Sequence, residues 1–271
     1  MKSVSILGCG WLGLPLGEYL VGKGYGVKGS TRTPGALTAM KAAGIEPYYI
    51  SLGPGLTGGD GLERFFESDV LVINFPPERR EDIVRFHTGQ IKSLVSRVEK
   101  SPVKNVIFVS STSVYPELGR EVSEDEKAPP EKASGKALVA AERLLLENRA
   151  FRTAVLRFGG LIGYDRKPGR FISGRRGLTG GDSPVNLVHR DDCVLVIERI
   201  IEKDAYGEIF NACADLHPKR KDYYTAQALR IGVTPPVFED GGEPAFKVVR
   251  SDKLKTLLGY EFKYPDPSLI D

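Results

Sequence analysis

A glycine-rich turn between an apolar run and a helical segment constrains this chain more than any other feature. Residues 4–7 form a short, mostly apolar run that is typical of a buried strand. The next six residues, Gly8-Cys9-Gly10-Trp11-Leu12-Gly13, have the spacing G-x-G-x-x-G. Apolar residues then recur at helical intervals until further glycines end the pattern. A strand, a tight turn and a helix in this order predict the first crossover of a parallel sheet.

The alternation of strand-like and helix-like segments continues beyond this turn. Further strands are expected at 25–29, 47–52, 69–74, 105–110 and 153–157, with helices at 34–43, 78–100 and 134–148. On the helix at 78–100, the apolar side is expected to carry Ile83, Phe86, Ile91, Leu94 and Val98. Strands that alternate with helices pair in parallel through right-handed crossovers. The expected fold class is therefore α/β, a Rossmann-type doubly wound parallel sheet with a smaller C-terminal substrate-side lobe.

The glycine spacing also predicts a ligand. In this context the first glycine permits a tight turn, the second lets a pyrophosphate approach the backbone, and the third allows the helix to pack closely on the strand. Amide groups at the start of the helix, from Trp11 to Leu14, are expected to face the phosphates. We therefore expect a nicotinamide dinucleotide at Gly8, Gly10, Trp11, Leu12 and Gly13.

The end of the second strand bears on the choice of cofactor. An NAD site usually has an acid there, which accepts hydrogen bonds from the ribose hydroxyls. This chain has Ser30, Thr31 and Arg32 instead, which are able to donate to a phosphate and to pair with its charge. NADP is therefore favoured, with NAD as the alternative. Asn74, Phe75 and Pro76 end the fourth strand at the cofactor crevice and are expected to contact the dinucleotide.

The rest of the chain divides less clearly. We expect residues 1–157 to form the NAD(P)-binding Rossmann domain and residues 158–271 the substrate-side lobe, with 185–215 returning to the sheet. Glycines crowd the stretch from 159 to 181, which predicts loops that carry specificity. Helices are expected at 193–202, 222–231 and 251–258, and a strand at 208–212.

Composition narrows the range of partners. A net charge of +3 without a basic run argues against nucleic acid, and no apolar run has the length needed to span a membrane. The cysteines are three in number and widely spaced, without the arrangement of a zinc site, so we expect a cytoplasmic protein and no metal.

Several blocks along nearly the whole chain resemble the extended short-chain dehydrogenase/reductase superfamily, and most of all its atypical epimerase/dehydratase-like branch. These blocks are ILGCGWLG at the start, NVIFVSSTSVYP at 105–116, LRFGGLIGYDR at 156–166, VNLVHRDDC at 185–193 and FNACAD at 210–215. The resemblance implies an NAD(P)-binding oxidoreductase or an epimerase/dehydratase-like enzyme. By position, Ser111 matches the serine that orients the substrate oxygen in that family.

The family's tyrosine and lysine do not transfer to this chain. Their pattern is Tyr, three residues, Lys, three residues, Glu. Anchoring it on Glu142 places Leu138 at the lysine and Ser134 at the tyrosine, whereas anchoring it on Lys136 places Lys132 at the tyrosine. Tyr164, in the loop expected over the substrate, is the remaining candidate proton donor by location.

Two classes of function stay open at this point. The first is an NADP-dependent enzyme that acts on a small molecule, and the second is a dinucleotide sensor that has lost the chemistry. Val185 stands where nucleotide-sugar members of the family carry an arginine, which weakens that assignment. An anionic substrate would follow if arginines of the substrate side converge, namely Arg157, Arg170, Arg175 and Arg176. His189 and Asp192 are expected to brace the sheet edge, and a homodimer is an open alternative.

Overall fold

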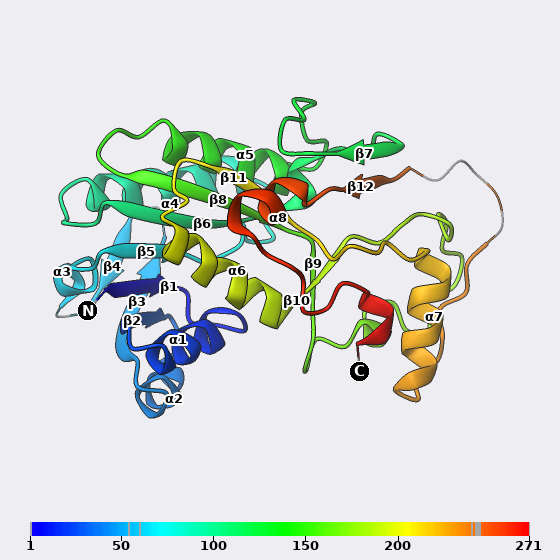
Figure 1. Cartoon of the computed structure of the whole chain (residues 1–271), viewed down its shortest axis with the longest axis horizontal. Helices are drawn as coiled ribbons and strands as arrows, with labels where there is room; N and C mark the ends of the chain where they lie inside the picture. Colours follow the sequence, from blue (N-terminus) through cyan, green and yellow to red (C-terminus); the bar gives the residue numbers. More distant parts are fainter. Residues whose placement is uncertain (1, 54, 60, 240, 242–244, 271) are drawn as a thin grey trace. The chain divides into compact units, whose positions relative to one another are not determined.

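The computed structural model describes residues 2–53, 55–59, 61–239, 241 and 245–270, and the chain forms two compact units. The first comprises the residues up to Val114 together with Pro129–Arg157 and Val194–Phe210. The second comprises Tyr115–Ala128, Phe158–Cys193 and the described residues from Asn211 onward. Figure 1 labels the helices and strands of both units.

An eight-stranded sheet forms the centre of the first unit. Its order is β11 (Ile209–Ala212), β8 (Arg152–Phe158), β6 (Asn105–Ser111), β5 (Val70–Ile73), β1 (Ser3–Leu7), β2 (Gly26–Thr31), β3 (Glu46–Leu52) and β4 (Leu56–Gly58). From β3 through β2, β1 and β5 to β6 the pairing is parallel, and β4 joins β3 in the antiparallel sense. Strand β1 pairs with β2 on one side and β5 on the other, so the strand order reverses there. This doubly wound arrangement confirms the predicted fold class.

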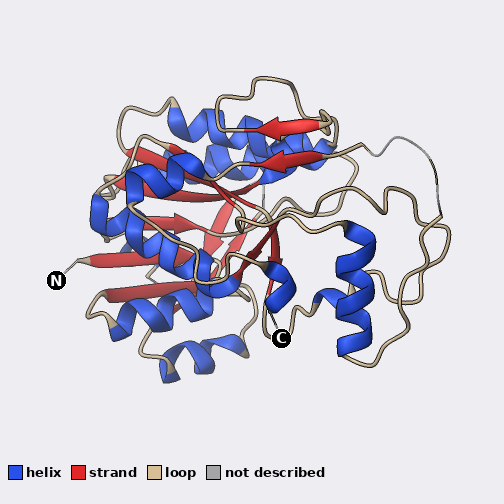
Figure 2. Cartoon of the chain, turned by 45° about the vertical axis from the view of Figure 1, so that its right-hand side comes forward, coloured by secondary structure: helices blue, strands red, loops and turns tan. Residues whose placement is uncertain are grey.

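Helices cover both faces of the sheet, as Figure 2 shows. These helices are α1 (Gly13–Gly22), α2 (Ala36–Ala42), α3 (Leu62–Phe65), α4 (Ile83–Val98), α5 (Ala133–Leu146) and α6 (Arg190–Lys203). The central strands are buried on both sides, and every residue of β5 is buried. On α4, the predicted Phe86 is only partly buried under the Arg80 guanidinium, and His87 takes the buried position instead.

The second unit contains two short parallel strand pairs, β9 (Gly160–Ile162) with β10 (Leu187–His189) and β7 (Arg120–Val122) with β12 (Lys247–Val249). The second unit also contains the helices α7 (Arg220–Arg230) and α8 (Asp252–Leu258). The short 3-10 turns are Thr112–Val114 in the first unit and Pro168–Arg170 and Pro267–Leu269 in the second. An apolar cluster of Ile162, Val185, Leu187, Tyr223 and Ile270 forms part of the core of the second unit.

Candidate functional site

The glycine-rich loop between β1 and α1 is closed onto the end of β5. Gly8 has a φ of 110°, a conformation that side chains beyond glycine rarely adopt, and a Cβ there would lie 2.4 Å from the Asn74 carbonyl oxygen. A Cβ on Gly13 would lie 2.2 Å from the Gly8 carbonyl oxygen. The Asn74 side-chain amide donates to the same Gly8 oxygen across 2.9 Å. The loop therefore has no room for side chains at its first and third glycines.

The second glycine differs, because a Cβ on Gly10 would meet no atom within 4 Å. Open space thus lies beside bare main chain at the start of α1, and this loop is at the carboxyl end of β1, where the strand order reverses. Such a place suits an anionic diphosphate, since helix N-termini present amides and a positive dipole end. One expected donor is excluded, because the Leu14 amide already donates to the Gly10 carbonyl at 3.0 Å.

The three residues at the end of β2 have different roles in the structure. The Ser30 hydroxyl, which we expected to donate to a phosphate, accepts from the Gly8 amide at 3.1 Å and is only 1% exposed. Ser30 therefore supports the loop from within. Thr31 accepts from the Thr33 amide at 3.0 Å, and Arg32 forms a 2.9 Å ion pair with Glu78. Sequence reasoning missed Glu78, since nothing local to it indicates its partner.

The residues after β5 lie beside this loop. Asn74 is partly buried in its bond to Gly8, and the Phe75 ring packs edge-on against His87 with centroids 5.5 Å apart. Pro76 is exposed. Cys9, inside the loop, is buried, and burial raises the pKa of its thiol to about 12. The Cys9 thiol is therefore protonated and unreactive at neutral pH.

Ser111 ends β6 and is partly buried. Its hydroxyl oxygen accepts from the Ser113 amide at 3.2 Å. The neighbouring Ser110 faces the interior instead, where it donates to a Glu142 carboxylate oxygen at 2.6 Å. Successive side chains of a strand point to opposite faces of the sheet, which separates these two adjacent serines.

Glu142 also binds Arg157, and this contact corrects one expectation. The Arg157 guanidinium donates to the two carboxylate oxygens at 3.1 and 2.6 Å, and the side chains are only 9% and 4% exposed. Arg157 is thus neutralised inside the first unit and does not join an anion site on the substrate side.

Helix α5 has no acid–base pair at the positions of the family's tyrosine and lysine. Leu138, at the lysine position when the pattern is anchored on Glu142, is 3% exposed and packed in the core. Ser134, at the tyrosine position, is exposed, as are Lys132 and Lys136 of the other register. Neither register therefore supplies a tyrosine with a lysine one turn away.

Tyr164 lies in the second unit, in an unusual backbone conformation. Its φ is 56°, its side chain is exposed, and its hydroxyl donates to Asp191 at 2.8 Å. The Arg190 guanidinium lies over its ring at 3.7 Å. The hydrogen bond to Asp191 raises the pKa of the phenol, which disfavours the phenolate. Strained backbone of this kind often occurs at functional sites.

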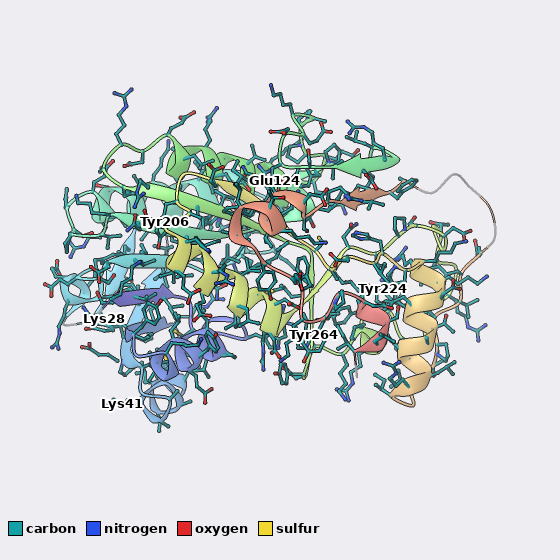
Figure 3. All side chains as sticks on the ribbon, in the orientation of Figure 1. Lys28, Lys41, Glu124, Tyr206, Tyr224 and Tyr264 are labelled. Carbon is teal, nitrogen blue, oxygen red and sulfur yellow. The ribbon has the colours of Figure 1, made fainter. Side chains whose placement is uncertain are left out.

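His189 and Asp192 are buried and contact the C-terminal segment. His189 is buried, and its ring lies 4.0 Å from that of Tyr264, which Figure 3 labels. Asp192 is fully buried and accepts from the Tyr260 hydroxyl at 2.6 Å and the Lys263 amide at 2.7 Å. Burial raises the pKa of Asp192, and the donated bonds oppose this rise. These contacts fasten the C-terminal segment at residues 260–264, and the expected role at the sheet edge stays a prediction.

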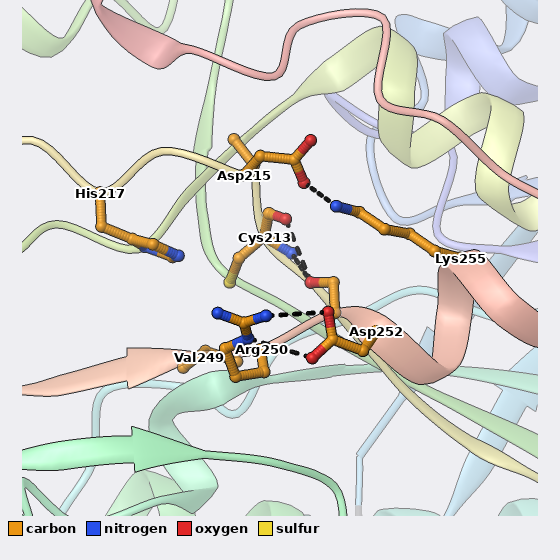
Figure 4. Close-up of a pocket in the computed structure, with 9 residues that line it drawn as sticks. Cys213, Asp215, His217, Val249, Arg250, Asp252 and Lys255 are labelled. Atoms are coloured by element: carbon orange, nitrogen blue, oxygen red, sulfur yellow. Dashed lines mark hydrogen bonds and ion pairs between the residues drawn. The ribbon is translucent and has the colours of Figure 1, made fainter.

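A polar pocket of about 260 Å³ opens in the second unit (Figure 4). Its charged walls are internally paired: Lys255 binds Asp215, and Arg250 binds Asp252 at 3.1 Å. His217 lines it too, and burial lowers the pKa of that imidazole. Ser251, another lining residue, accepts a hydrogen bond from the Cys213 amide and donates one to the Cys213 carbonyl. The sequence did not predict this pocket, because its walls come from segments separated along the chain.

The described residues offer neither a metal site nor a membrane-spanning helix. Within the described ranges, no group of three histidine, cysteine or carboxylate side chains is arranged to hold a metal ion. No helix among the described residues combines the length and the apolar character needed to cross a bilayer.

Comparison with known proteins gives relatives in sequence and in fold. No family model matches the chain. Protein YeeZ of Escherichia coli (strain K12) is 34% identical over 274 residues, covering 100% of this chain and 99% of the relative.

Two solved structures share the fold. UDP-glucuronic acid 4-epimerase from Bacillus cereus in complex with NAD aligns with a TM-score of 0.78 and 20% identity, covering 97% of this chain and 94% of that one. A short-chain dehydrogenase/reductase superfamily protein from Agrobacterium tumefaciens with bound NAD aligns with a TM-score of 0.76 and 19% identity, covering 97% and 93%. The fold is therefore that of the short-chain dehydrogenase/reductase and epimerase proteins, as the sequence blocks predicted.

Proposed function

The chain belongs to the family of Protein YeeZ, and from this premise and its fold we propose that it binds a nicotinamide dinucleotide and acts on a small molecule as an oxidoreductase or epimerase/dehydratase-like enzyme. Residues 1–157 would hold the dinucleotide and residues 158–271 would supply the substrate side. The two aligned structures were each solved with NAD, which supports this class of cofactor.

The observation that carries the proposal is the shape of the main chain between Gly8 and Gly13. The loop is closed against Asn74 behind and open at Gly10 in front, so a diphosphate is able to approach bare backbone there. The amides of Trp11, Leu12 and Gly13 are the proposed donors. When bound, the nicotinamide ring would accept or return a hydride. The protein's part is to hold that ring and the substrate in register.

We propose NADP as the preferred form. Thr31 ends β2 and Arg32 follows it, on the side where the adenosine ribose of a dinucleotide lies, and no acid is present among residues 29–32. A guanidinium binds a 2′-phosphate through charge-assisted hydrogen bonds. NAD remains the alternative.

Ser111 is the proposed substrate-orienting group. Because its oxygen accepts from the Ser113 amide, its own hydrogen is available for donation to a substrate oxygen. Tyr164 is the second candidate donor, and its single hydroxyl hydrogen, which Asp191 accepts at 2.8 Å, would have to turn from Asp191 to the substrate.

The proposal for the substrate class starts from cationic side chains that are already paired with carboxylates. Arg157 forms a buried ion pair with Glu142, and in the polar pocket Arg250 and Lys255 are each paired with an aspartate. In that pocket a neutral or zwitterionic molecule rich in hydroxyl groups fits better than a strong anion, since an anion would have to displace the aspartates. Arg170, Arg175 and Arg176 are exposed side chains of the second unit, and through them an anionic substrate stays the alternative.

The test is turnover with a panel of aldehydes, ketones and sugar nucleotides, followed through the absorbance of NADPH and by product analysis. Ser111→Ala is expected to lower turnover about 10²-fold while NADPH binding is retained. Ser113→Ala is the matched control, since it keeps the amide that binds Ser111. Equal rates for Ser111→Ala and the parent protein would exclude the assigned role.

A dinucleotide sensor is the second candidate, and buried Leu138 at the lysine position favours it. A leucine there supplies no charge to lower a neighbouring pKa and no donor for the nicotinamide ribose. Tight binding of NADPH without turnover on any member of the panel would establish this alternative over the enzyme.

A further inference from the structure

An ion pair joins the loops on either side of the glycine-rich turn. Arg32 directly follows β2, and Glu78 lies four residues beyond Asn74, after β5. A distance of 2.9 Å separates the Arg32 Nη1 and Glu78 Oε1 atoms. Because β2 and β5 are the two neighbours of β1, this pair links the segments that flank the carboxyl end of β1. The Gly8–Gly13 loop begins at that end.

The pair brings to the end of β2 the acid that the local sequence lacks. Dinucleotide sites with a carboxylate at this place bind the ribose hydroxyls of NAD, and those with an arginine accommodate the 2′-phosphate of NADP. Here both groups are present, from positions 46 residues apart, and each already satisfies the other. A 2′-phosphate that approaches Arg32 has to compete with the Glu78 carboxylate, whereas a 2′-hydroxyl does not.

We propose that Glu78 is a positioning residue that sets the choice between NADP and NAD, by holding Arg32 as its counter-ion. The inference rests on the proposed dinucleotide site and goes beyond it. Loss of the Glu78 charge releases Arg32 to the 2′-phosphate and strengthens the preference for NADP. Loss of the Arg32 charge removes that preference.

The size of the effect follows from exposure. The Arg32 side chain is 74% exposed and that of Glu78 is 39% exposed, so water screens their attraction. Exposed pairs of this kind change an equilibrium by a few-fold, up to about fivefold. A charge-assisted contact from Arg32 to phosphate is worth more, about tenfold or greater.

The experiment measures dissociation constants of NAD+ and NADP+ by calorimetry and takes their ratio. Glu78→Gln is expected to raise the ratio of the NAD+ constant to the NADP+ constant about fivefold. Asp82→Asn is the matched control, because Asp82 lies four residues beyond Glu78 and is likewise paired with arginines, Arg80 and Arg85. The control is expected to leave the ratio within about twofold. A ratio that is unchanged or lowered by Glu78→Gln overturns the proposal.

A second comparison tests the route through Arg32. In an Arg32→Gln background, Glu78→Gln is expected to change the ratio by less than about twofold, since no guanidinium remains to be released. A full effect in that background would show that Glu78 acts without Arg32, and would overturn the counter-ion role. If neither dinucleotide binds the parent protein, the proposed function itself fails, and this outcome is distinct from an unaltered ratio.

Discussion

The Asn74 side chain donates to the carbonyl oxygen of Gly8 across 2.9 Å, and so the end of β5 holds the first turn of the glycine-rich loop. The contact joins neighbouring strands at the point where the sheet order reverses. It fixes the backbone against which a diphosphate would lie, without using any of the loop's own amides. The loop is thus shaped before a ligand arrives, which lowers the entropy cost of binding.

Asn74→Ala should lower both stability and dinucleotide affinity. The Gly8 carbonyl would lose its partner in a partly buried place, and the expected loss in the free energy of unfolding is about 1–2 kcal/mol, measured by urea denaturation. Asn148→Ala is the control, since Asn148 makes a comparable but exposed bond to Glu99. Affinity for NADPH unaffected by Asn74→Ala would contradict the view that this bond shapes the binding loop.

Gly13 and Gly10 should respond differently to one added methyl group. Gly13→Ala places a Cβ against the Gly8 carbonyl and is expected to destabilise the fold by about 1–3 kcal/mol. Gly10→Ala meets no protein atom, so stability should change by no more than about 0.5 kcal/mol. Its methyl would nevertheless occupy the space for the diphosphate and weaken NADPH binding at least about tenfold. Thermal unfolding and calorimetry measure the two effects separately, and full affinity in Gly10→Ala would place the diphosphate elsewhere.

The buried pair of Glu142 and Arg157 should be costly to break on one side only. Glu142→Gln is expected to lower the free energy of unfolding by about 3–5 kcal/mol, because it leaves the arginine buried without its counter-charge. The double variant Glu142→Leu, Arg157→Met should recover most of that loss. For the exposed pair of Arg152 and Asp204, Asp204→Asn should cost at most about 1 kcal/mol. Similar losses in the buried and exposed pairs would argue that burial is unimportant here.

The chain's three histidines should make the protein sensitive to acid. Burial is the largest influence on His87, His189 and His217, and it lowers the pKa of each below the ordinary value of 6.5. The unfolded chain therefore binds protons at a higher pH than the folded chain does. Their contribution to stability is complete above pH 6.5 and is lost as the pH falls from there through the folded-state pKa values.

Urea midpoints measured at pH 8, 7, 6 and 5 test this expectation. The midpoint should be nearly constant between pH 8 and 7 and should fall below pH 6.5. Proton NMR titration of the imidazole rings assigns the change to individual histidines. A midpoint that rises on acidification to pH 6 would show that partners of the histidines outweigh their burial.

Much of the first unit could be predicted from the sequence, because its central strands are short runs of residues buried on both faces. Strand β5, four consecutive buried residues, is an example. The three-residue strands, which are β4, β7, β9, β10 and β12, could not be predicted, since such short segments carry no period and depend on a partner elsewhere in the chain. Helix α4 gives a further example. Its hydrophobic pattern predicted that Phe86 is buried, but the neighbouring His87 is buried instead.

By itself, the sequence determined the glycine-rich turn and the order of strands and helices around it, since both follow from local backbone freedom and local periodicity. Only the tertiary structure decided which partners the polar groups have. Ser30 binds the Gly8 amide, Arg157 is paired with Glu142, and Arg32 is paired with Glu78. The reason is physical. The partner of a charge or a hydroxyl is whatever group the fold brings within about 3 Å of it, and spacing along the chain does not encode that distance.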